Sequence, residues 1–424
     1  MSIYDSFRKS YKISTDSRHI EPASVFFALK GERFDGNDFA FEVAEAGVAS
    51  LVVADRQSLP DHPRIVKVDD SLKALQELAL YHRQQMQKLK VLSITGTNGK
   101  TTTKELVSAV LSRKYNTIYT QGNFNNHIGV PLTLLHITPE TEFAVVEMGA
   151  NHPGEIQTLA NLACPDYGII TNIGKAHLEG FGSFEGVIKT KNELYENLKA
   201  RDKTAFVNAD NELLMDLSKD LSRHTYGTNG QAECSVSLKA CDPYLSVTWE
   251  GLSIQTHLVG SYNFENVAAA IAVGKYFGVD ANDIKAALED YQPTNSRSQV
   301  IEGRNRIIMD AYNANPTSMN ASVRNFRQIS GDNALLILGD MRELGDASEQ
   351  EHKTILELLK SSGFQQAFLV GPCFSKYNDN PAFLTFATVD ELVAYLGQNP
   401  VEGCTILVKG SRGIQLEKVL PSIQ

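Results

Sequence analysis

A glycine-rich stretch, ITGTNGKTTT over residues 94–103, ends in the Gly-Lys-Thr that phosphate-binding loops use. The usual loop has a glycine where Ile94 stands, whereas the nearest upstream glycine here is Gly96, so the loop is short. It follows the apolar run VLSIT and precedes a helical pattern, TTTKELVSAVLSRK, which is the context that a phosphate cradle requires. Lys100 can then reach the terminal phosphates, and the Thr101 hydroxyl can ligate Mg²⁺. We therefore predict a shortened nucleotide-binding loop.

Other side chains near strand ends could complete a metal site. Glu147 ends the apolar strand FAVVE, and His177 lies past the run YGIITNIG. Ligands of open α/β sheets bind at the carboxyl ends of strands, so both can face a cation there. From position alone, Glu147 is equally a carboxylate in a solvated loop, and His177 a structural hydrogen-bonder. Lys191, within IKTKNELYENL, by itself indicates an exposed helical lysine.

Three sections of the chain position these residues. Residues 1–84 hold short strand patterns between helical stretches, and residues 85–295 alternate apolar runs with helix-length segments. That alternation predicts a mostly parallel sheet with helices on both faces. Residues 233–260 alternate apolar and polar positions, which predicts antiparallel strands at the edge of this sheet. Residues 296–424 again alternate strands and helices, so the chain is predicted to be an α/β protein of three domains.

Composition narrows the partners. The 424 residues carry a net charge of −10, which argues against nucleic acid or an anionic membrane surface as the main partner. The five cysteines are scattered and lack a Cys-x-x-Cys pair, as in a reducing compartment. The first residues do not have the apolar core of a signal peptide, and no apolar run approaches the ~18 residues of a bilayer span. We expect a soluble cytoplasmic protein without membrane insertion.

The short loop resembles that of the Mur ligases and folylpolyglutamate synthases, which form amides with ATP. Residues 15–39 (TDSRHIEPASVFFALKGERFDGNDF) resemble the UDP-binding domain of the Mur ligases. Further resemblances to the central and C-terminal domains follow in order: QGNFNNHIGVPLTLL (121–135), VVEMGANHPGEI (145–156), TNIGKAHLEGFGS (171–183), DAYNANPTSMNAS (310–322), LGDMRELG (338–345) and VKGSR (408–412). The resemblance implies a UDP-substrate domain, a central P-loop domain with a parallel sheet, and a Rossmann-like C-terminal domain.

The resemblance also implies roles for individual residues. The ATP-binding set comprises Gly96, Thr97, Asn98, Gly99, Lys100, Thr101, Thr102, Asn266, Arg297, Asp310 and Asn313. Two Mg²⁺ ions are expected at Thr101, Glu147 and His177, with Lys191 as a carbamylated lysine beside them; Lys100, Glu147, His177 and Lys191 form the catalytic set. The muramoyl and uridine-diphosphate substrate is expected at Ser17, Arg18, Asp35, Gly36, Asn125 and Asn126.

This sequence departs from the family pattern at a few positions. Tyr262 replaces the histidine of the family's His-Asn-x-x-Asn, in which Asn263 is also a candidate helix cap, and Asn37 replaces the histidine of Asp-Gly-His. Lys189 competes with Lys191 for the carbamate position. The interval from Arg297 to Asp310 is short, so that Arg304 and Arg306 compete with Arg297.

The implied reaction transfers the γ-phosphoryl of ATP to the carboxylate of UDP-N-acetylmuramoyl-tripeptide, and the amine of D-alanyl-D-alanine then attacks the acyl phosphate. The third tripeptide residue stays open between diaminopimelate and lysine, as does the cation that holds the dipeptide carboxylate: Lys409, Arg412 or Arg342. We expect a monomer.

The sequence argues against four alternatives. A catalytically inactive binding protein should have lost Lys100, Glu147 or His177, and all three are present. A relative that adds a single amino acid often carries Asp-Asn-Pro-Arg, but here Ala382 follows Asp-Asn-Pro. Folylpolyglutamate synthases do not have the UDP-binding domain. A GTPase switch should carry Asn-Lys-x-Asp, which is absent from the sequence.

Overall fold

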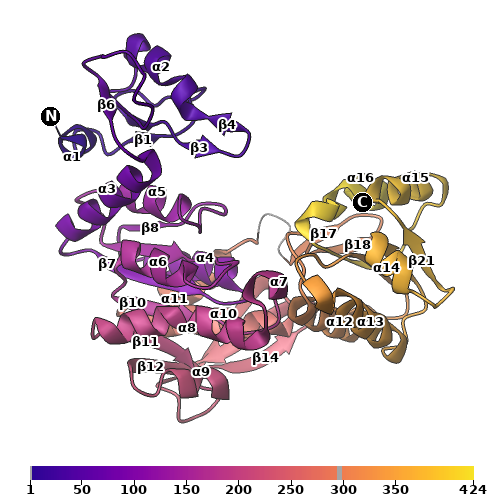
Figure 1. Ribbon diagram of the computed structural model, residues 1–424. Helices are drawn as coiled ribbons and strands as arrows, with labels where there is room; N and C mark the ends of the chain where they lie inside the picture. Colours follow the sequence, from indigo (N-terminus) through magenta and orange to yellow (C-terminus); the bar gives the residue numbers. More distant parts are fainter. Residues whose placement is uncertain (1, 294–297) are drawn as a thin grey trace.

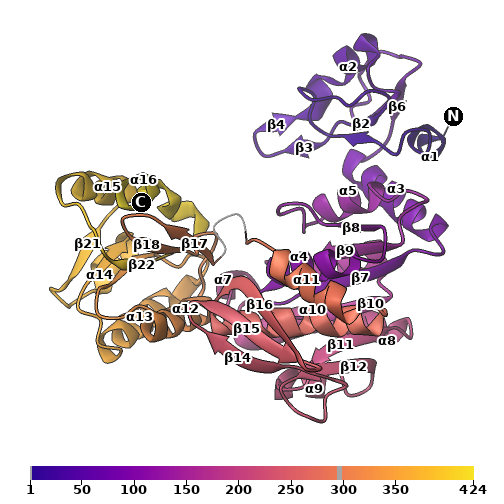
Figure 2. The same cartoon turned by 180° about the vertical axis from the view of Figure 1, so that it is seen from behind.

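The computed structural model describes residues 2–293 and 298–424. Figures 1 and 2 show three α/β units in chain order, with the N-terminal unit at one end of the central unit and the C-terminal unit beside it. Arg297, one of the predicted ATP residues, lies outside the described residues.

The N-terminal unit is built on a four-stranded parallel sheet of order β1-β2-β5-β6. Its strands are β1 (Ile13–Ser14), β2 (Val25–Phe27), β5 (Leu51–Ala54) and β6 (Ile65–Lys67), with a hairpin of β3 (Lys30–Gly31) and β4 (Phe34–Asp35). The helical segments are α1 (Ile3–Phe7), η1 (Gly36–Asp38) and α2 (Ala40–Ala46). The short strand patterns that the sequence shows in residues 1–84 include VFFAL, SLVVA and RIVKV, which contain β2, β5 and β6, respectively.

Helix α3 (Ser71–Gln85) joins this unit to the next one. It begins where the Asp70 side chain accepts a hydrogen bond from the Lys73 N–H, and it packs on α5 (Gly129–Leu135) and α6 (Glu155–Ala163). Near its end, the buried Arg83 guanidinium donates to the Ala163 carbonyl and to the Asp166 carboxylate. The end of α3 is thus fixed to the central unit, and the predicted boundary after residue 84 falls in its last turn.

A seven-stranded, wholly parallel sheet forms the central unit, in the order β13-β12-β11-β10-β7-β9-β8. The strands are β7 (Lys90–Thr95), β8 (Thr117–Tyr119), β9 (Phe143–Glu147), β10 (Tyr167–Ile170), β11 (Thr204–Asn208), β12 (Ser222–Gly227) and β13 (Cys234–Ser235). Besides α5 and α6, its helices are α4 (Lys100–Leu111), α7 (Leu178–Phe181), α8 (Phe184–Ala200), α9 (Glu212–Leu217), α10 (Phe264–Tyr276) and α11 (Ala281–Asp290). Buried side chains fill two cores, one on each face, as the unbroken apolar runs of the strands require.

Residues 237–259 correct one expectation. They form antiparallel strands as predicted, but these make a separate three-stranded sheet: β14 (Ser237–Cys241), β15 (Tyr244–Trp249) and β16 (Leu252–Val259). Only the short β13 joins the edge of the parallel sheet. The apolar face of the small sheet, with Leu245, Val247 and Ile254, instead completes the core that holds α4, α10 and α11. Burial of that face determines where the sheet lies.

The C-terminal unit has a six-stranded sheet of order β17-β18-β22-β19-β20-β21, parallel except for β17. Its strands are β17 (Gln299–Glu302), β18 (Arg306–Met309), β19 (Ala334–Gly339), β20 (Ala367–Val370), β21 (Phe383–Phe386) and β22 (Thr405–Lys409). The helical segments are α12 (Pro316–Ile329), η3 (Gly345–Ala347), α13 (Ser348–Ser361), α14 (Pro372–Tyr377), α15 (Val389–Gln398), η4 (Arg412–Ile414), η5 (Leu416–Val419) and α16 (Leu420–Ile423). Cores on both faces give the expected Rossmann-like layering. Strands β17 and β21 were not predicted.

Across residues 2–293 and 298–424, no helix combines the length and the apolar character needed to cross a bilayer.

Candidate functional site

A cavity of about 1090 Å³ lies where the central and C-terminal units meet. It is lined by many of the predicted residues: Thr97, Asn98, Gly99, Lys100, Thr101, Thr102, Asn125, Asn126, Glu147, His177, Asn266, Asp310 and Asn313. The carboxyl ends of β7, β9 and β18 therefore face one space, as open α/β sheets arrange their ligand sites.

The short loop between β7 and α4 depends on its two glycines. Gly96 has φ +140° and Gly99 has φ +80°. Residues other than glycine rarely adopt these backbone angles. A Cβ at Gly96 would lie 2.0 Å from Thr171 Oγ1, and a Cβ at Gly99 would lie 2.4 Å from Asn266 Oδ1. The loop backbone thus runs directly against β10 and α10, and α4 starts immediately after Gly99, with its first N–H groups at the cavity.

Hydrogen bonds to the segment after β10 fix the backbone of the loop. The Asn98 N–H donates to Asn172 Oδ1 (3.0 Å), and Thr171 Oγ1 donates to the Asn98 carbonyl (2.6 Å). Lys100 Nζ donates to the carbonyls of Gly96 (2.8 Å) and Thr97 (2.9 Å), so its ammonium lies over the loop where an anion would sit.

Glu147 is a buried carboxylate with one satisfied oxygen. It ends β9 opposite Ile94 of β7, and only 2% of its surface is exposed. Oε1 accepts from Asn125 Nδ2 at 2.8 Å, while Oε2 has no hydrogen-bond partner in the part of the chain that the structure describes. A buried anionic oxygen requires a compensating charge. With the Thr101 hydroxyl and the His177 imidazole on the same cavity, the donors suit a divalent cation.

The structure separates Lys191 from its rival Lys189. Both lie on α8, but Lys189 is exposed whereas Lys191 is 2% exposed. Burial, and then the nearby Lys100 ammonium, lower the pKa of Lys191 to about 7. Lys191 Nζ lies 5.5 Å from the centre of the Phe181 ring. The exposed helical lysine that position alone indicated is therefore wrong, because α8 turns Lys191 into the protein.

Two asparagines behind the loop make structural contacts. Asn266 Oδ1 accepts from Thr103 Oγ1 (3.0 Å), and Asn266 Nδ2 donates to Asn263 Oδ1 (2.9 Å). The predicted side-chain cap by Asn263 is wrong: Asn263 is helical and donates instead to the Val259 carbonyl at 2.8 Å. Tyr262, which stands where the family pattern has histidine, lines the cavity and bonds Ser298 Oγ at 3.0 Å.

Asp310 follows β18 and anchors the far wall of the cavity. Lys409 Nζ lies 2.6 Å from Asp310 Oδ2, and Ser322 Oγ donates to the same oxygen at 3.1 Å. Lys409 is 2% exposed, and its charge is paired with the Asp310 carboxylate. The competitors Arg304 and Arg306 contact the Ser422 carbonyl and Glu302, respectively, and are not among the residues that line the cavity.

The predicted uridine-diphosphate residues are located in the N-terminal unit and not in this cavity. Arg18 is exposed and pairs with Asp16 at 2.6 Å, and Ser17 lies beside it. Asp35 pairs with Arg56 at 2.9 Å. A Cβ at Gly36 would lie 2.8 Å from the Leu29 carbonyl oxygen, so the backbone there is closely packed.

Contacts between the central and C-terminal units beside the cavity escaped sequence analysis. Asn315 Nδ2 donates to Asn98 Oδ1 (2.8 Å), and Lys175 Nζ pairs with Glu351 (2.7 Å). His177 pairs with Glu343. These partners lie far apart in the sequence, and no spacing rule links them; the stretch LGDMRELG, which contains Glu343, was noted only as a family resemblance.

Comparison with known proteins agrees with this architecture. Residues 9–83 match the family model "Mur ligase family, catalytic domain", residues 94–274 match "Mur ligase middle domain", and residues 296–412 match "Mur ligase, glutamate ligase domain". The UDP-N-acetylmuramoyl-tripeptide–D-alanyl-D-alanine ligase of Bacillus subtilis (strain 168) is 36% identical over 427 residues, covering 97% of this chain and 92% of the relative.

Solved structures of Mur ligases have the same fold as this chain. MurF from Acinetobacter baumannii superposes with a TM-score of 0.86 at 31% identity, covering 97% of this chain and 93% of the other. MurF ligase from Thermotoga maritima, in complex with ADP, superposes with a TM-score of 0.84 at 26% identity, covering 97% and 96%. By sequence over nearly its whole length and by the order of its three domains, the chain belongs to the Mur ligase family.

Proposed function

We propose that the protein is an ATP-dependent ligase that adds D-alanyl-D-alanine to UDP-N-acetylmuramoyl-tripeptide, in the synthesis of peptidoglycan precursors. The observation that carries the proposal is the 36% identity, over 97% of this chain, to a relative that bears this name. The cavity supports the proposal, because the short phosphate-binding loop lines one side of it and the Rossmann-like C-terminal unit lines the other. Because ATP and a UDP-linked substrate are consumed, we place the enzyme in the cytoplasm.

The chemistry begins with the meeting of two anions. The tripeptide carboxylate attacks the γ-phosphorus of ATP, the bond to the β-phosphate oxygen breaks, and an acyl phosphate and ADP result. The dipeptide amine then attacks the acyl carbon, loses a proton and expels phosphate. Lys100 and the N–H groups at the start of α4 stabilise the negative charge on the transferring group.

Thr101, Glu147 and His177 would hold the Mg²⁺ ions. Bound there, Mg²⁺ would neutralise phosphate charge and orient the nucleotide. Glu147 Oε2, buried and without a partner among the described residues, carries this assignment. Asn125 fixes the carboxylate through Oε1 and, with Asn126, forms the side of the cavity at which we place the muramoyl tripeptide.

Lys191 is proposed to react with CO₂. Its neutral amine attacks the carbon, a C–N bond forms, and one proton is released, leaving a carbamate anion. The depressed pKa of about 7 supplies the neutral amine, and the Lys100 cation that helps to depress it would face the new anion.

The remaining assignments follow the domains, proposed as residues 1–84, 85–295 and 296–424. Ser17, Arg18, Asp35 and Gly36 bind the uridine diphosphate. Asn266 contacts the adenine and Asp310 the ribose, with Asn313 and Arg297 on the nucleotide. We also propose that the domains close on their ligands about hinges near residues 84 and 295, the second of which lies outside the described residues.

Among the three cations considered for the dipeptide carboxylate, we favour Arg412. Lys409 is paired with Asp310, and Arg342 donates to the Gly413 carbonyl at 3.1 Å. The exposed Arg412 guanidinium instead stacks on Tyr312, a residue of the cavity wall, at 5.0 Å from the ring centre.

A ligase that adds a single amino acid is the second candidate. Its Asp-Asn-Pro-Arg motif is incomplete here, and Asp379 lies on the surface, where it pairs with Lys360 at 2.6 Å. Residues 379–381 are not among those that line the cavity.

The deciding experiment is phosphate release from ATP with each combination of nucleotide-peptide and amine. We expect D-alanyl-D-alanine to exceed D-alanine by orders of magnitude in kcat/KM, because a site built for two residues leaves polar groups unpaired with one. Equal use of D-alanine, or preference for diaminopimelate on the shorter UDP-dipeptide, would exclude this assignment.

A further inference from the structure

A carboxylate of the C-terminal unit reaches across to a histidine of the central unit. His177 Nδ1 lies in direct contact with Glu343 Oε2. The Glu343 carbonyl also accepts a hydrogen bond from the Glu179 N–H, at 3.4 Å. Side chain and backbone of Glu343 therefore both meet the segment after β10.

The loop that carries Glu343 is anchored along its length. The Met341 N–H donates to His352 Nε2 at 3.1 Å, and the Arg342 N–H donates to Ser411 Oγ at 2.9 Å. Ser411 in turn donates its N–H to the Asp340 carbonyl at 3.2 Å. Residues 340–342 are thus bonded to α13 and to the segment after β22, and the position of Glu343 follows from theirs.

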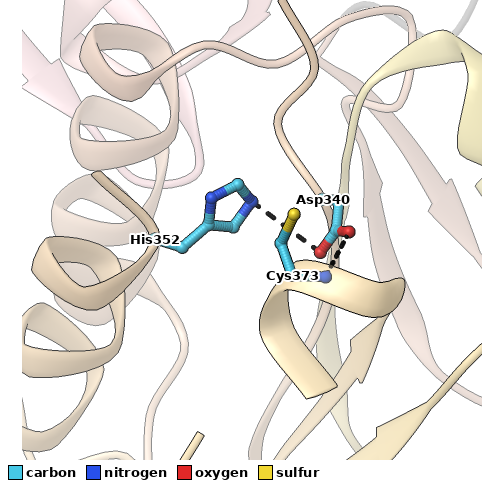
Figure 3. A group of neighbouring side chains, drawn as sticks. All are labelled: Asp340, His352 and Cys373. Carbon is cyan, nitrogen blue, oxygen red and sulfur yellow. Dashed lines mark hydrogen bonds and ion pairs between the residues drawn. The ribbon is translucent and has the colours of Figure 1, made fainter. Parts of the chain in front are cut away.

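Figure 3 shows a group of side chains next to this loop, made of the buried Asp340 and His352 and the half-buried Cys373. These residue types could suggest a metal site, but their donors have other partners. The Asp340 carboxylate accepts from the N–H groups of Cys373 (2.8 Å) and Phe374 (2.9 Å), so it caps α14. His352 Nδ1 bonds the Ser348 carbonyl at 2.7 Å, which leaves Nε2 to accept from Met341. Burial lowers the pKa of His352 and keeps the ring neutral. The three residues therefore stabilise the loop and are not a metal site.

The carboxylate determines which nitrogen of His177 can bind a cation. The contact with the carboxylate favours the tautomer in which Nδ1 carries the hydrogen, and in that tautomer the lone pair of the ring lies on Nε2. Metal-binding histidines commonly donate their other ring nitrogen to a carboxylate, which fixes the tautomer and the ring orientation. His177 lines the cavity together with Glu147, whose Oε2 is buried and has no partner within the described ranges.

We propose that Glu343 is a positioning residue, which orients His177 so that Nε2 faces a divalent cation bound at Glu147. Because Glu343 belongs to the C-terminal unit, cation binding then depends on closure of that unit onto the central one. This inference rests on the proposed role of His177 as a metal ligand and extends it to the opposite domain.

The test is Mn²⁺ binding to the full-length protein, followed by electron paramagnetic resonance with one equivalent of a non-hydrolysable ATP analogue. We expect Glu343→Ala to weaken Mn²⁺ binding by about 10- to 100-fold, the usual effect of losing such a partner. Glu343→Gln should lie between, since its amide oxygen still accepts from Nδ1–H. Asp346→Asn, an exposed carboxylate on the same segment, is the matched control and should bind Mn²⁺ like the wild type.

A double-mutant cycle with His177→Ala separates positioning from a general structural effect. Glu343→Ala should have little further effect on Mn²⁺ binding once His177 is absent. A full, additive effect in that background, or wild-type Mn²⁺ binding by Glu343→Ala, would overturn the inference while the ligase assignment stands. If His177→Ala itself bound Mn²⁺ normally, the metal role of His177 would fail, and this inference with it. Melting temperatures of all variants exclude unfolding as the cause.

Discussion

Replacement of Lys191 by methionine tests the most unusual side chain of the site. A lysine with the ordinary pKa of about 10.4 is neutral in about one molecule in 250 at pH 8. With its pKa lowered to about 7, Lys191 is neutral in about nine molecules in ten at that pH. The structure therefore raises the fraction that can react with CO₂ by roughly 200-fold over an exposed lysine such as Lys189.

The assay is carbon-13 NMR of the protein equilibrated with labelled bicarbonate at pH 8. We expect one carbamate resonance in the wild type and in Lys189→Met, and none in Lys191→Met. Turnover of the wild type should fall when CO₂ is removed and return with bicarbonate, whereas Lys191→Met should be slow and insensitive to both. A wild-type spectrum without this resonance, or a resonance that survives Lys191→Met, would refute the reasoning.

The same shift predicts how stability depends on pH in CO₂-free buffer. Between about pH 7 and pH 10 the unfolded chain binds one more proton at Lys191 than the folded chain, because only the folded pKa is lowered. The free energy of unfolding therefore rises with pH across this interval, by up to about 1.4 kcal/mol per pH unit from this group. Urea unfolding of Lys191→Met should show a correspondingly smaller rise. An equal rise in both proteins would mean that folding does not lower the pKa of Lys191.

Two further substitutions test the loop. Lys100→Ala should lower kcat by roughly 10²- to 10³-fold without unfolding the protein, since it removes a cation directed at the transferring charge; near-normal turnover in a phosphate-release assay would exclude the loop as the ATP site. Gly99→Ala should lower the free energy of unfolding by about 1–2 kcal/mol for the left-handed backbone alone, and should weaken nucleotide binding in calorimetry because its Cβ would press on Asn266. Unchanged ADP affinity in Gly99→Ala would show that the loop tolerates the displacement.

Local patterns predicted the parts of the fold that local physics determines. The apolar run before Glu147 predicted a buried strand, and the structure pairs that strand with β7, which brings Glu147 to the short loop. Its role in metal binding stays a prediction. The position of the sheet formed by residues 237–259 could not be predicted from the alternation of apolar and polar residues. That alternation shows that one face is apolar, but it does not show which helices will cover this face. The difference between Lys189 and Lys191 likewise came from the packing of α8, since two positions two residues apart look alike in one sequence.

The short loop also explains why the C-terminal unit must take part in the site. With fewer residues of its own, the loop leaves its sides to other segments: Thr171 and Asn172 follow β10 on one side, and Asn266 of α10 fills the space behind Gly99. Asn98, at the tip, meets Asn315 of the C-terminal unit, whose side chain also accepts from the Ser318 N–H and caps α12. A cradle completed by another domain is complete only when the domains are together. Because the contact between His177 and Glu343 depends on the same approach, we expect the phosphate-binding half and the proposed metal-binding half of the site to form in one closure step.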